Sequence, residues 1–329
     1  MTTAAYMRIA LIGLCLTASA GWADSALAEN FDTSGPGYVD REVLDLFTVE
    51  ETTFVLDAPD GMRRFGEQAQ NVVQEHWAAI AQLAGAPAGA TVTVSVEREI
   101  DAWFERRNQP PRNPEWAAGL AISSQNAIIV RSGSQTWQDT LRHELAHIAV
   151  GLASGEQRVP VWFNEGFAVA TAEQWSLDRA GTMMRAGLTG NFHPFGELRD
   201  RFPATSSSAD LAYAQSFHLV RFVRDDHGED VFREIMGRMR EGGESWDDAF
   251  IATIGLNEAA VVVAWEDYVT SRYKWAPATL GGGGAWGVAA LVMIVAYRRS
   301  KRRAQTRLAE LQRIEAAQYR MDPDDEIFG

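Results

Sequence analysis

The sequence contains a single cysteine among its 329 residues, Cys15, which lies in an apolar stretch near the N-terminus. One thiol excludes an intramolecular disulfide framework, and it also excludes a metal site built from several cysteines. Basic residues are few as well, because 30 Lys and Arg stand against 44 Asp and Glu, which gives a formal net charge of -14. A nucleic-acid-binding protein needs a basic face for phosphates, so this balance argues against such a partner.

Long apolar runs are scarce, and the two clearest lie near the ends of the chain. Arg8 precedes an apolar run over residues 9–20, and small residues follow it, a pattern typical of a secretory signal peptide. We expect residues 1–28 to be this signal. An uncleaved N-terminal anchor is the alternative, although the run is short for a bilayer span. The candidate cleavage positions follow Ala20, Ala23 and Ala28.

Residues 276–297 contain no charged side chain and are followed by a basic cluster. About 20 apolar residues span a bilayer, and a dense basic cluster marks the cytoplasmic side. The sequence therefore predicts a single-pass protein of the cell membrane, with residues 29–275 on the periplasmic or extracellular side and a cytoplasmic tail over residues 298–329. The glycines at 281–284 leave an alternative, in which a linker leads into a buried helix. The basic cluster consists of Arg298, Arg299, Lys301, Arg302 and Arg303.

Between these ends, the sequence pattern changes from strand-bearing to helical. Alternating Thr and Val over residues 91–96 indicate a strand, and residues 116–122 and 127–130 indicate a hairpin. We expect an α+β fold, with a small mixed sheet and helices in an N-terminal lobe that ends near residue 151, followed by an all-helical C-terminal lobe. The other expected elements are a strand at 52–56 and helices at 62–83, 137–151, 164–175, 211–223, 230–239, 246–254 and 259–273.

Two of these helices carry signals for their ends. Thr136 and Asp139 fit a capping box in front of the helix that starts at residue 137, and Gly151 is a natural stop for it. The next helix follows Pro160, and Asn164 is the expected N-cap residue. Both helices matter because the residues that carry chemistry lie on them.

The central motif is His143-Glu144-Leu145-Ala146-His147. Residues four apart share one face of a helix, so His143 and His147 can present two imidazoles to one metal ion. Glu144 lies beside them, where it can reach a metal-bound water without being a ligand. The alternative is a pair of buried histidines that happen to share a helix face.

A catalytic zinc ion needs a third protein ligand and an open position for water. The arrangement HExxHxxGxxH is excluded, because Val150 and Ala153 occupy its glycine and third histidine positions. The next helix supplies an acid instead, Glu165, which lies 18 positions after His147. An acid that only stabilises the helix N-terminus is the alternative. We expect one Zn²⁺ ion held by two histidines and Glu165.

The strings HELAH and WFNEGFA together resemble those of the gluzincin zinc metallopeptidases, and more closely those of peptidase-MA-like domains. The resemblance covers about residues 50–275, although its specific motifs lie within about 135–225. It implies His143, His147 and Glu165 as zinc ligands and Glu144 as the general base, acting on a peptide or protein substrate. The family fold implied is a small mixed sheet next to a helical lobe.

The resemblance also implies a donor for the oxyanion that develops during hydrolysis. Similar domains carry a Tyr and a Ser at the spacing found in Tyr213-Ala214-Gln215-Ser216, so Tyr213 is the candidate. A tyrosine half-buried in packing is the alternative. His193, His218 and His227 are weaker candidates for the same role.

This sequence departs from its relatives in two places. Zinc aminopeptidases carry a Gly-Ala-Met-Glu-Asn string whose acid binds the substrate amino terminus, whereas residues 119–123 contain no acid. Thermolysin-like enzymes place an Asp four residues after the ligand Glu to orient one His, whereas this chain has Val169. The first departure disfavours an exopeptidase, and the second leaves the partner of the ligand histidines unidentified. Residues 116–122 are a candidate cleft edge for an extended peptide.

We therefore expect a membrane-anchored zinc peptidase, specifically an endopeptidase, that uses zinc-activated water and a glutamate base. The main alternative is a catalytically silent binding or assembly module that keeps the gluzincin fold. A zinc hydrolase for a non-peptide amide or ester is a third hypothesis.

Overall fold

The computed structural model describes residues 41–59, 61–110, 117–172, 177–203, 206–273, 287 and 290–302. It divides into two compact units, Met1–Thr270 and Ser271–Gly329. The expected signal peptide over residues 1–28 lies outside the described residues, as does most of the expected membrane segment over 276–297.

A five-stranded mixed sheet forms in the first unit, with the strand order β1-β2-β3-β5-β4. The two edge strands are antiparallel to their neighbours, whereas β3 is parallel to both β2 and β5. The predicted mixed sheet and the predicted hairpin of β4 and β5 are confirmed. β1 is missing from the sequence prediction, whose first expected strand is at residues 52–56. The bounds are β1 Arg41–Val49, β2 Thr52–Pro59, β3 Thr91–Glu97, β4 Gly119–Ile122 and β5 Ala127–Arg131.

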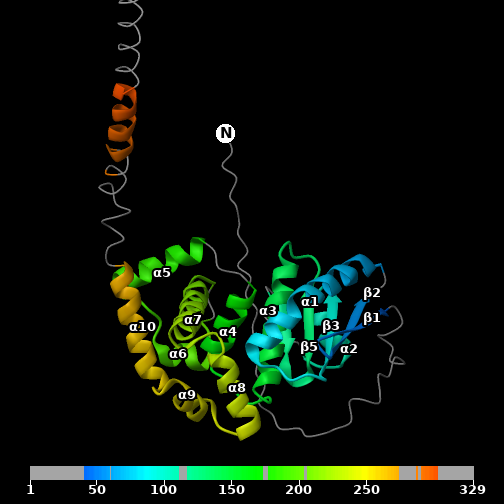
Figure 1. Cartoon of the computed structure of the whole chain (residues 1–329). Coiled ribbons are helices and arrows are strands. Elements are labelled where there is room, and N and C mark those ends of the chain that lie inside the picture. Colours follow the sequence, from blue (N-terminus) through cyan, green and yellow to red (C-terminus); the bar gives the residue numbers. More distant parts are fainter. Residues whose placement is uncertain are drawn as a thin grey trace, which may run out of the picture. The chain divides into compact units, whose positions relative to one another are not determined.

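Helices α1 (Arg63–Ala84) and α3 (Trp137–Ala153) pack on one face of this sheet (Figure 1). Side chains alternate between the faces of a strand, so Gly119 faces α3 while its neighbour Leu120 packs in the cluster that contains α2 (Asp101–Arg106) on the other face. α3 packs against the sheet on one side and against helices that follow it in the chain on the other.

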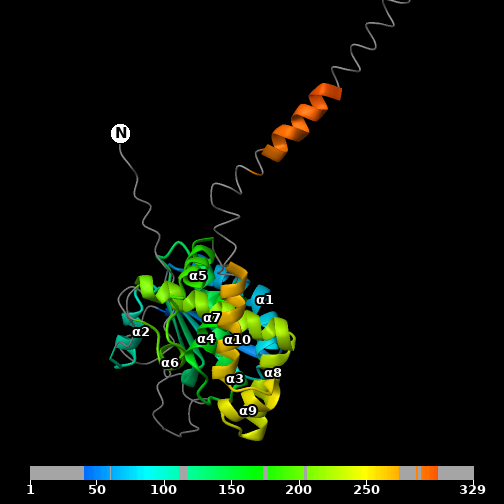
Figure 2. The same ribbon diagram turned by 90° about the vertical axis from the view of Figure 1, so that its left-hand side faces the viewer.

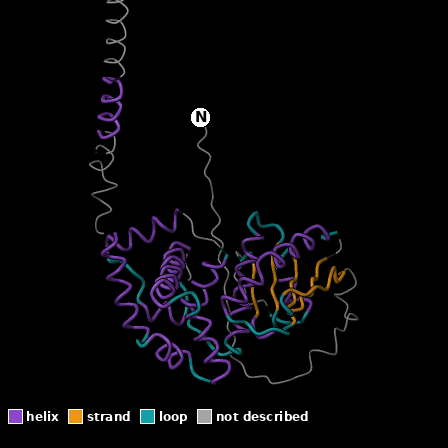
Figure 3. The backbone as a smooth tube through the Cα atoms, in the orientation of Figure 1, coloured by secondary structure: helices purple, strands orange, loops and turns teal. Residues whose placement is uncertain are grey.

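The remainder of the first unit is helical in every residue range that the structure describes between 161 and 273, apart from short connections (Figure 3). This confirms the predicted helical lobe, and Figure 2 shows these helices in front of the strands when the molecule is turned. α4 packs against both α3 and α7. The bounds are α4 Val161–Thr171, α5 Leu177–Thr189, α6 Phe195–Asp200, α7 Ser206–His227, α8 Val231–Gly242, α9 Trp246–Ile254 and α10 Glu258–Tyr273.

α4 and α7 come unusually close to each other at Gly166. A Cβ atom on Gly166 would lie 2.4 Å from the carbonyl oxygen of Ser216, a distance that real structures do not tolerate. Only glycine allows this approach, because it has no side chain. The contact brings the α7 residues near Ser216 close to the residues of α4 that flank Gly166.

The first residue of α3, Trp137, is as predicted, but the predicted stop at Gly151 and the predicted capping box are wrong. Gly151 lies inside α3, because the helix continues to Ala153 and a side chain at 151 would collide with Ser123, whose Cβ would be 2.8 Å away. Thr136 is the N-cap residue of α3 but makes no side-chain capping bond, and the partner proposed for it, Asp139, instead pairs with Arg142.

In the second unit, residues 290–302 form a helix whose described side chains are all exposed. Among the described residues, no single helix is long and apolar enough to cross a membrane. The helices α9 and α10 are long and apolar enough only when taken together, and a bend of 57° separates them.

Candidate metal centre and active site

The helix α3 presents the HELAH motif to the interior of the first unit. The apolar residues Leu141, Leu145 and Ile148 are fully buried and fix the rotation of the helix. His143 and His147 then stand side by side, with ring centroids 4.7 Å apart and ring planes at 83°. The predicted sharing of one helix face is confirmed.

The structure brings Glu165 of α4 to these two imidazoles. One oxygen of Glu165, Oε2, lies 3.4 Å from Nε2 of His143 and 3.7 Å from Nε2 of His147. One ligand atom from each of the three residues lies within 4.8 Å of the others. Ligand atoms at the usual zinc distances and tetrahedral angles are about 3.3 Å apart. Glu165 therefore already lies near the distance from both imidazoles that a shared zinc ion requires.

Burial favours the metal-binding form of the His147 imidazole. The pKa of His147 is lowered to about 4, chiefly by burial and further by His143, although the Glu165 charge and Asn164 oppose the shift. A neutral imidazole is the form that binds metal. His143 and Glu165 are each 3% exposed and His147 is 1% exposed, so the three residues form a buried cluster of two imidazoles and one acid.

Asn164 orients one of the imidazoles, a role that the sequence prediction did not assign. Nδ1 of His147 lies 3.0 Å from Oδ1 of Asn164, so Nδ1 carries the proton and donates a hydrogen bond to the amide oxygen. Nε2 is left with its lone pair for a metal. The prediction of Asn164 as the N-cap of α4 is wrong, because Pro160 occupies that position. Asn164, directly before Glu165, thus orients a candidate ligand histidine, a role that the apolar side chain of Val169 cannot fill.

An Asn164→Ala variant is expected to weaken zinc affinity by about 10- to 100-fold, the usual effect of removing a partner that orients a ligand histidine. The imidazole of His147 would lose its fixed tautomer. Competition with a chromophoric chelator measures the affinity of the purified protein. The exposed Asn257, which caps α10 by accepting from the Ala260 backbone, provides a matched control, Asn257→Ala. Equal affinities in Asn164→Ala and the parent would contradict the orienting role.

Glu144 is fully buried beside the candidate ligands, under the edge strand β4. A Cβ atom on Gly119 of β4 would lie 3.1 Å from Cγ and Oε1 of Glu144, so the strand lies directly against this side chain. Burial raises the pKa of Glu144 well above its usual value, the Glu165 charge raises it further, and the backbone of Ala121 opposes the rise. A carboxyl group with a raised pKa is a better proton acceptor than an ordinary one.

Tyr213 of α7 completes the group. Its side chain is 1% exposed, its ring centroid lies 6.4 Å from that of His143, and its hydroxyl is hydrogen-bonded to Glu165. Burial raises the pKa of Tyr213 well above 10.0, as do the charges of Glu165 and Glu144, while the nearby Arg179 opposes the shift. The hydroxyl therefore keeps its proton and can act as a donor.

The three weaker histidine candidates have partners of their own. His193 donates from Nε2 to the carbonyl oxygen of Ser208, 2.9 Å away. His218 accepts a bond from the indole N–H of Trp265. His227, at the end of α7, lies 3.3 Å from Asp226. Tyr213 is thus the candidate donor that the structure brings to the three clustered ligands.

Comparison with known proteins agrees with this geometry. A family described as the Peptidase MA superfamily matches residues 80–271, more than half of the chain. A solved crystal structure of a mutant two-domain M1 zinc metallopeptidase bound to L-arginine overlaps with a TM-score of 0.40 at 15% identity, covering 70% of this chain and 51% of that one. The chain thus spans about half the length of that protein. No curated protein matches. The family match and the buried His143, His147 and Glu165 agree, and the chain belongs to the Peptidase MA superfamily as a gluzincin-like peptidase domain.

Proposed function

We propose that this protein is a zinc-dependent endopeptidase anchored in a membrane. The observation that carries the proposal is the cluster of two imidazoles and one carboxylate with ligand atoms within 4.8 Å, next to a fully buried second carboxylate. His143, His147 and Glu165 would hold the ion, and Glu144 would act on water. Bound zinc would lower the pKa of a coordinated water toward ~7 and polarise the scissile carbonyl group.

The chain's own residues account for the remaining steps. Glu144 accepts the proton of the attacking water and later donates it to the amine that leaves. The Tyr213 hydroxyl donates a hydrogen bond to the oxyanion that forms at the former carbonyl oxygen, since it keeps its proton and lies within the site. Asn164 holds His147 in the tautomer that leaves Nε2 available.

The edge strand β4 supports an endopeptidase. Within the described part of the sheet, β4 pairs with β5 only, so no described strand occupies the edge where an extended peptide would add. Such a peptide would add as a further strand through backbone bonds, independent of its ends. Gly119 and Ala121 of β4 lie at Glu144, so an added strand would lie beside the proposed base. The absence of an acid in residues 119–123 removes the group that would bind a free amino terminus.

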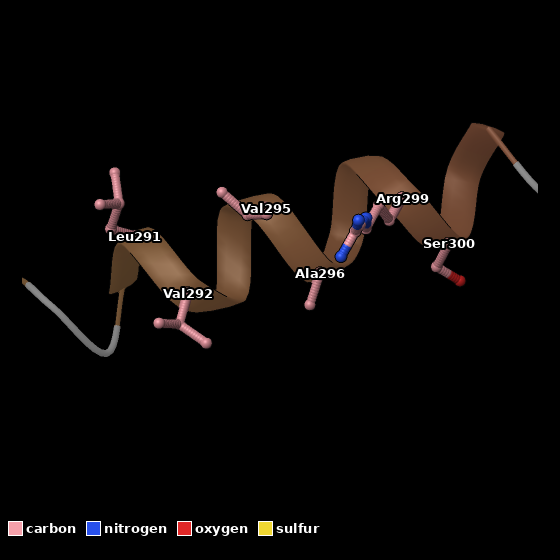
Figure 4. Close-up of a pocket in the computed structure, with 6 residues that line it drawn as sticks. All are labelled: Leu291, Val292, Val295, Ala296, Arg299 and Ser300. Atoms are coloured by element: carbon pink, nitrogen blue, oxygen red, sulfur yellow. The ribbon is translucent and has the colours of Figure 1, made fainter.

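The helix of residues 290–302 supports the membrane anchor. A shallow hollow follows one stripe of this helix, and all the residues around it belong to the helix itself, so it is a gap between neighbouring side chains (Figure 4). Leu291 and Met293 are 64% and 67% exposed, which is unfavourable in water and favourable in lipid. The apolar stripe ends at Arg299, where a basic residue would meet the cytoplasmic headgroups. The hollow is lined by Leu291, Val292, Val295, Ala296, Arg299 and Ser300.

One preparation tests both parts of the proposal. The full-length protein is expressed, the membranes are washed at alkaline pH, and the protein is extracted with detergent and assayed for metal and for cleavage of a mixed peptide pool. We expect it in the washed membranes, with one zinc ion per chain and with cuts inside peptides. Recovery in the soluble fraction would refute the anchor, and a protein without zinc would refute the metallopeptidase. Zinc without cleavage would favour a silent binding module.

A further inference from the structure

A buried carboxylate in the helical lobe collects hydrogen bonds from three other helices. Glu258, the first residue of α10, is 5% exposed. Its Oε1 accepts from the indole N–H groups of Trp162 and Trp246, at 3.0 and 2.7 Å, and its Oε2 accepts from Arg199 at 2.6 Å. Arg199 in turn contacts both carboxylate oxygens of Asp247, at 2.6 and 2.8 Å. The mechanism proposed above uses none of these residues.

One of these bonds reaches the helix that carries the third metal ligand. Trp162 belongs to the first turn of α4, three residues before Glu165 and two before Asn164. This end of α4 has no side-chain capping bond, because its N-cap residue is Pro160. The indole of Trp162 is 1% exposed and also packs on Trp246, with ring centroids 6.2 Å apart. The bond to Glu258 is thus a polar anchor at the N-terminal end of α4.

A small rotation of α4 would disturb the metal site. A side-chain tip about 5–6 Å from a helix axis moves by about 1 Å when the helix turns by about 10°. Metal–ligand distances tolerate only about 0.2 Å. Glu165 and Asn164 both move with α4, so one rotation would displace a ligand and the amide that orients His147. The rotation of α4 must therefore be fixed, and Trp162 is in a position to fix it.

We propose that Glu258 and Trp162 are positioning residues, which set the rotation of α4 and thereby the placement of Glu165 and Asn164 in the metal site. The inference rests on the proposed function, because it assumes that the cluster of His143, His147 and Glu165 binds zinc. It assigns a task to the buried Glu258 that stability alone does not require, since a buried ion pair adds little net stability compared with apolar packing.

The two tryptophans allow a matched experiment. Trp162→Phe and Trp246→Phe each remove one indole donor from the same oxygen of Glu258, but only Trp162 lies on α4. Zinc affinity is measured by chelator competition, the visible spectrum of the Co²⁺-substituted protein reports ligand geometry, and thermal unfolding of the metal-free protein reports stability. We expect Trp162→Phe to bind zinc about tenfold more weakly with a changed Co²⁺ spectrum, and Trp246→Phe to stay within about twofold of the parent. Both variants should lower the unfolding temperature.

Two outcomes overturn the proposal: unchanged zinc affinity in Trp162→Phe, or equal losses in the two variants, which would make the cluster a stability element only. If Trp162→Phe does not fold, Glu258→Gln replaces it. A neutral amide oxygen is a weaker acceptor, so a loss of about threefold is expected, and an unchanged affinity overturns the proposal. A parent protein that binds no zinc would instead refute the proposed function itself.

Discussion

Replacing Glu144 by Gln is expected to lower kcat/KM by about 10²- to 10⁴-fold while zinc stays bound, because the amide cannot accept the proton of water. Zinc should remain because the three clustered ligand residues are unchanged and Glu144 is outside that group. The side chain keeps its size, which matters for a fully buried residue that lies against Gly119. The loss should therefore appear in catalysis and not in folding.

The matched control for this variant is Glu67→Gln. Glu67 is an exposed residue of α1, and its replacement removes the same charge from the same unit. Steady-state cleavage of a peptide found in the mixed pool gives kcat/KM, and metal analysis gives the zinc content. A Glu144→Gln protein that cleaves as fast as the parent would exclude Glu144 as the base.

Tyr213→Phe is expected to reduce kcat by about 10²- to 10³-fold, the usual effect of removing one donor to a developing oxyanion. The phenol keeps its proton, since its pKa lies well above 10.0, and it is held in the site by burial. Phenylalanine retains the edge-on contact with Phe202, whose ring centroid is 4.8 Å away, so the packing should survive.

The measurement must separate two roles, because the Tyr213 hydroxyl is also bonded to Glu165. A donor to the transition state lowers kcat and leaves zinc affinity unchanged. A group that only orients Glu165 weakens zinc binding by about 10- to 100-fold. Tyr268→Phe, at a half-exposed position on α10, removes a hydroxyl from the same lobe and is the control. An unchanged kcat with unchanged zinc affinity would reduce Tyr213 to a packing residue.

Local sequence patterns predict the bounds of some elements well. The bounds predicted for α9 agree with the structure at both ends, and β3 extends one residue beyond its prediction. In these segments the apolar spacing alone determines which face is buried. The spacing of four between His143 and His147 likewise fixes their relation within one helix. The placement of Glu165 beside them was implied by the family resemblance and agrees with the structure.

Long-range contacts explain the structural features that local sequence patterns do not predict. Gly151 looks like a helix stop, but it serves the close packing of α3 on Ser123, which no local pattern shows. Asn164 is a typical residue type for a helix cap, but its side chain is hydrogen-bonded to His147 instead. The bond between Trp162 and Glu258 joins residues 96 positions apart, so no window of the sequence contains both. The sequence prediction also misses α5 and α6, and α6 has only 6 residues, too few for a clear periodic pattern.

The absence of a side chain at Gly166 constrains how α4 and α7 can move relative to each other. With a backbone carbonyl of α7 pressed against α4, neither helix can slide along the other without collision. We therefore expect Glu165 and Tyr213 to keep their separation when other parts of the helical lobe move.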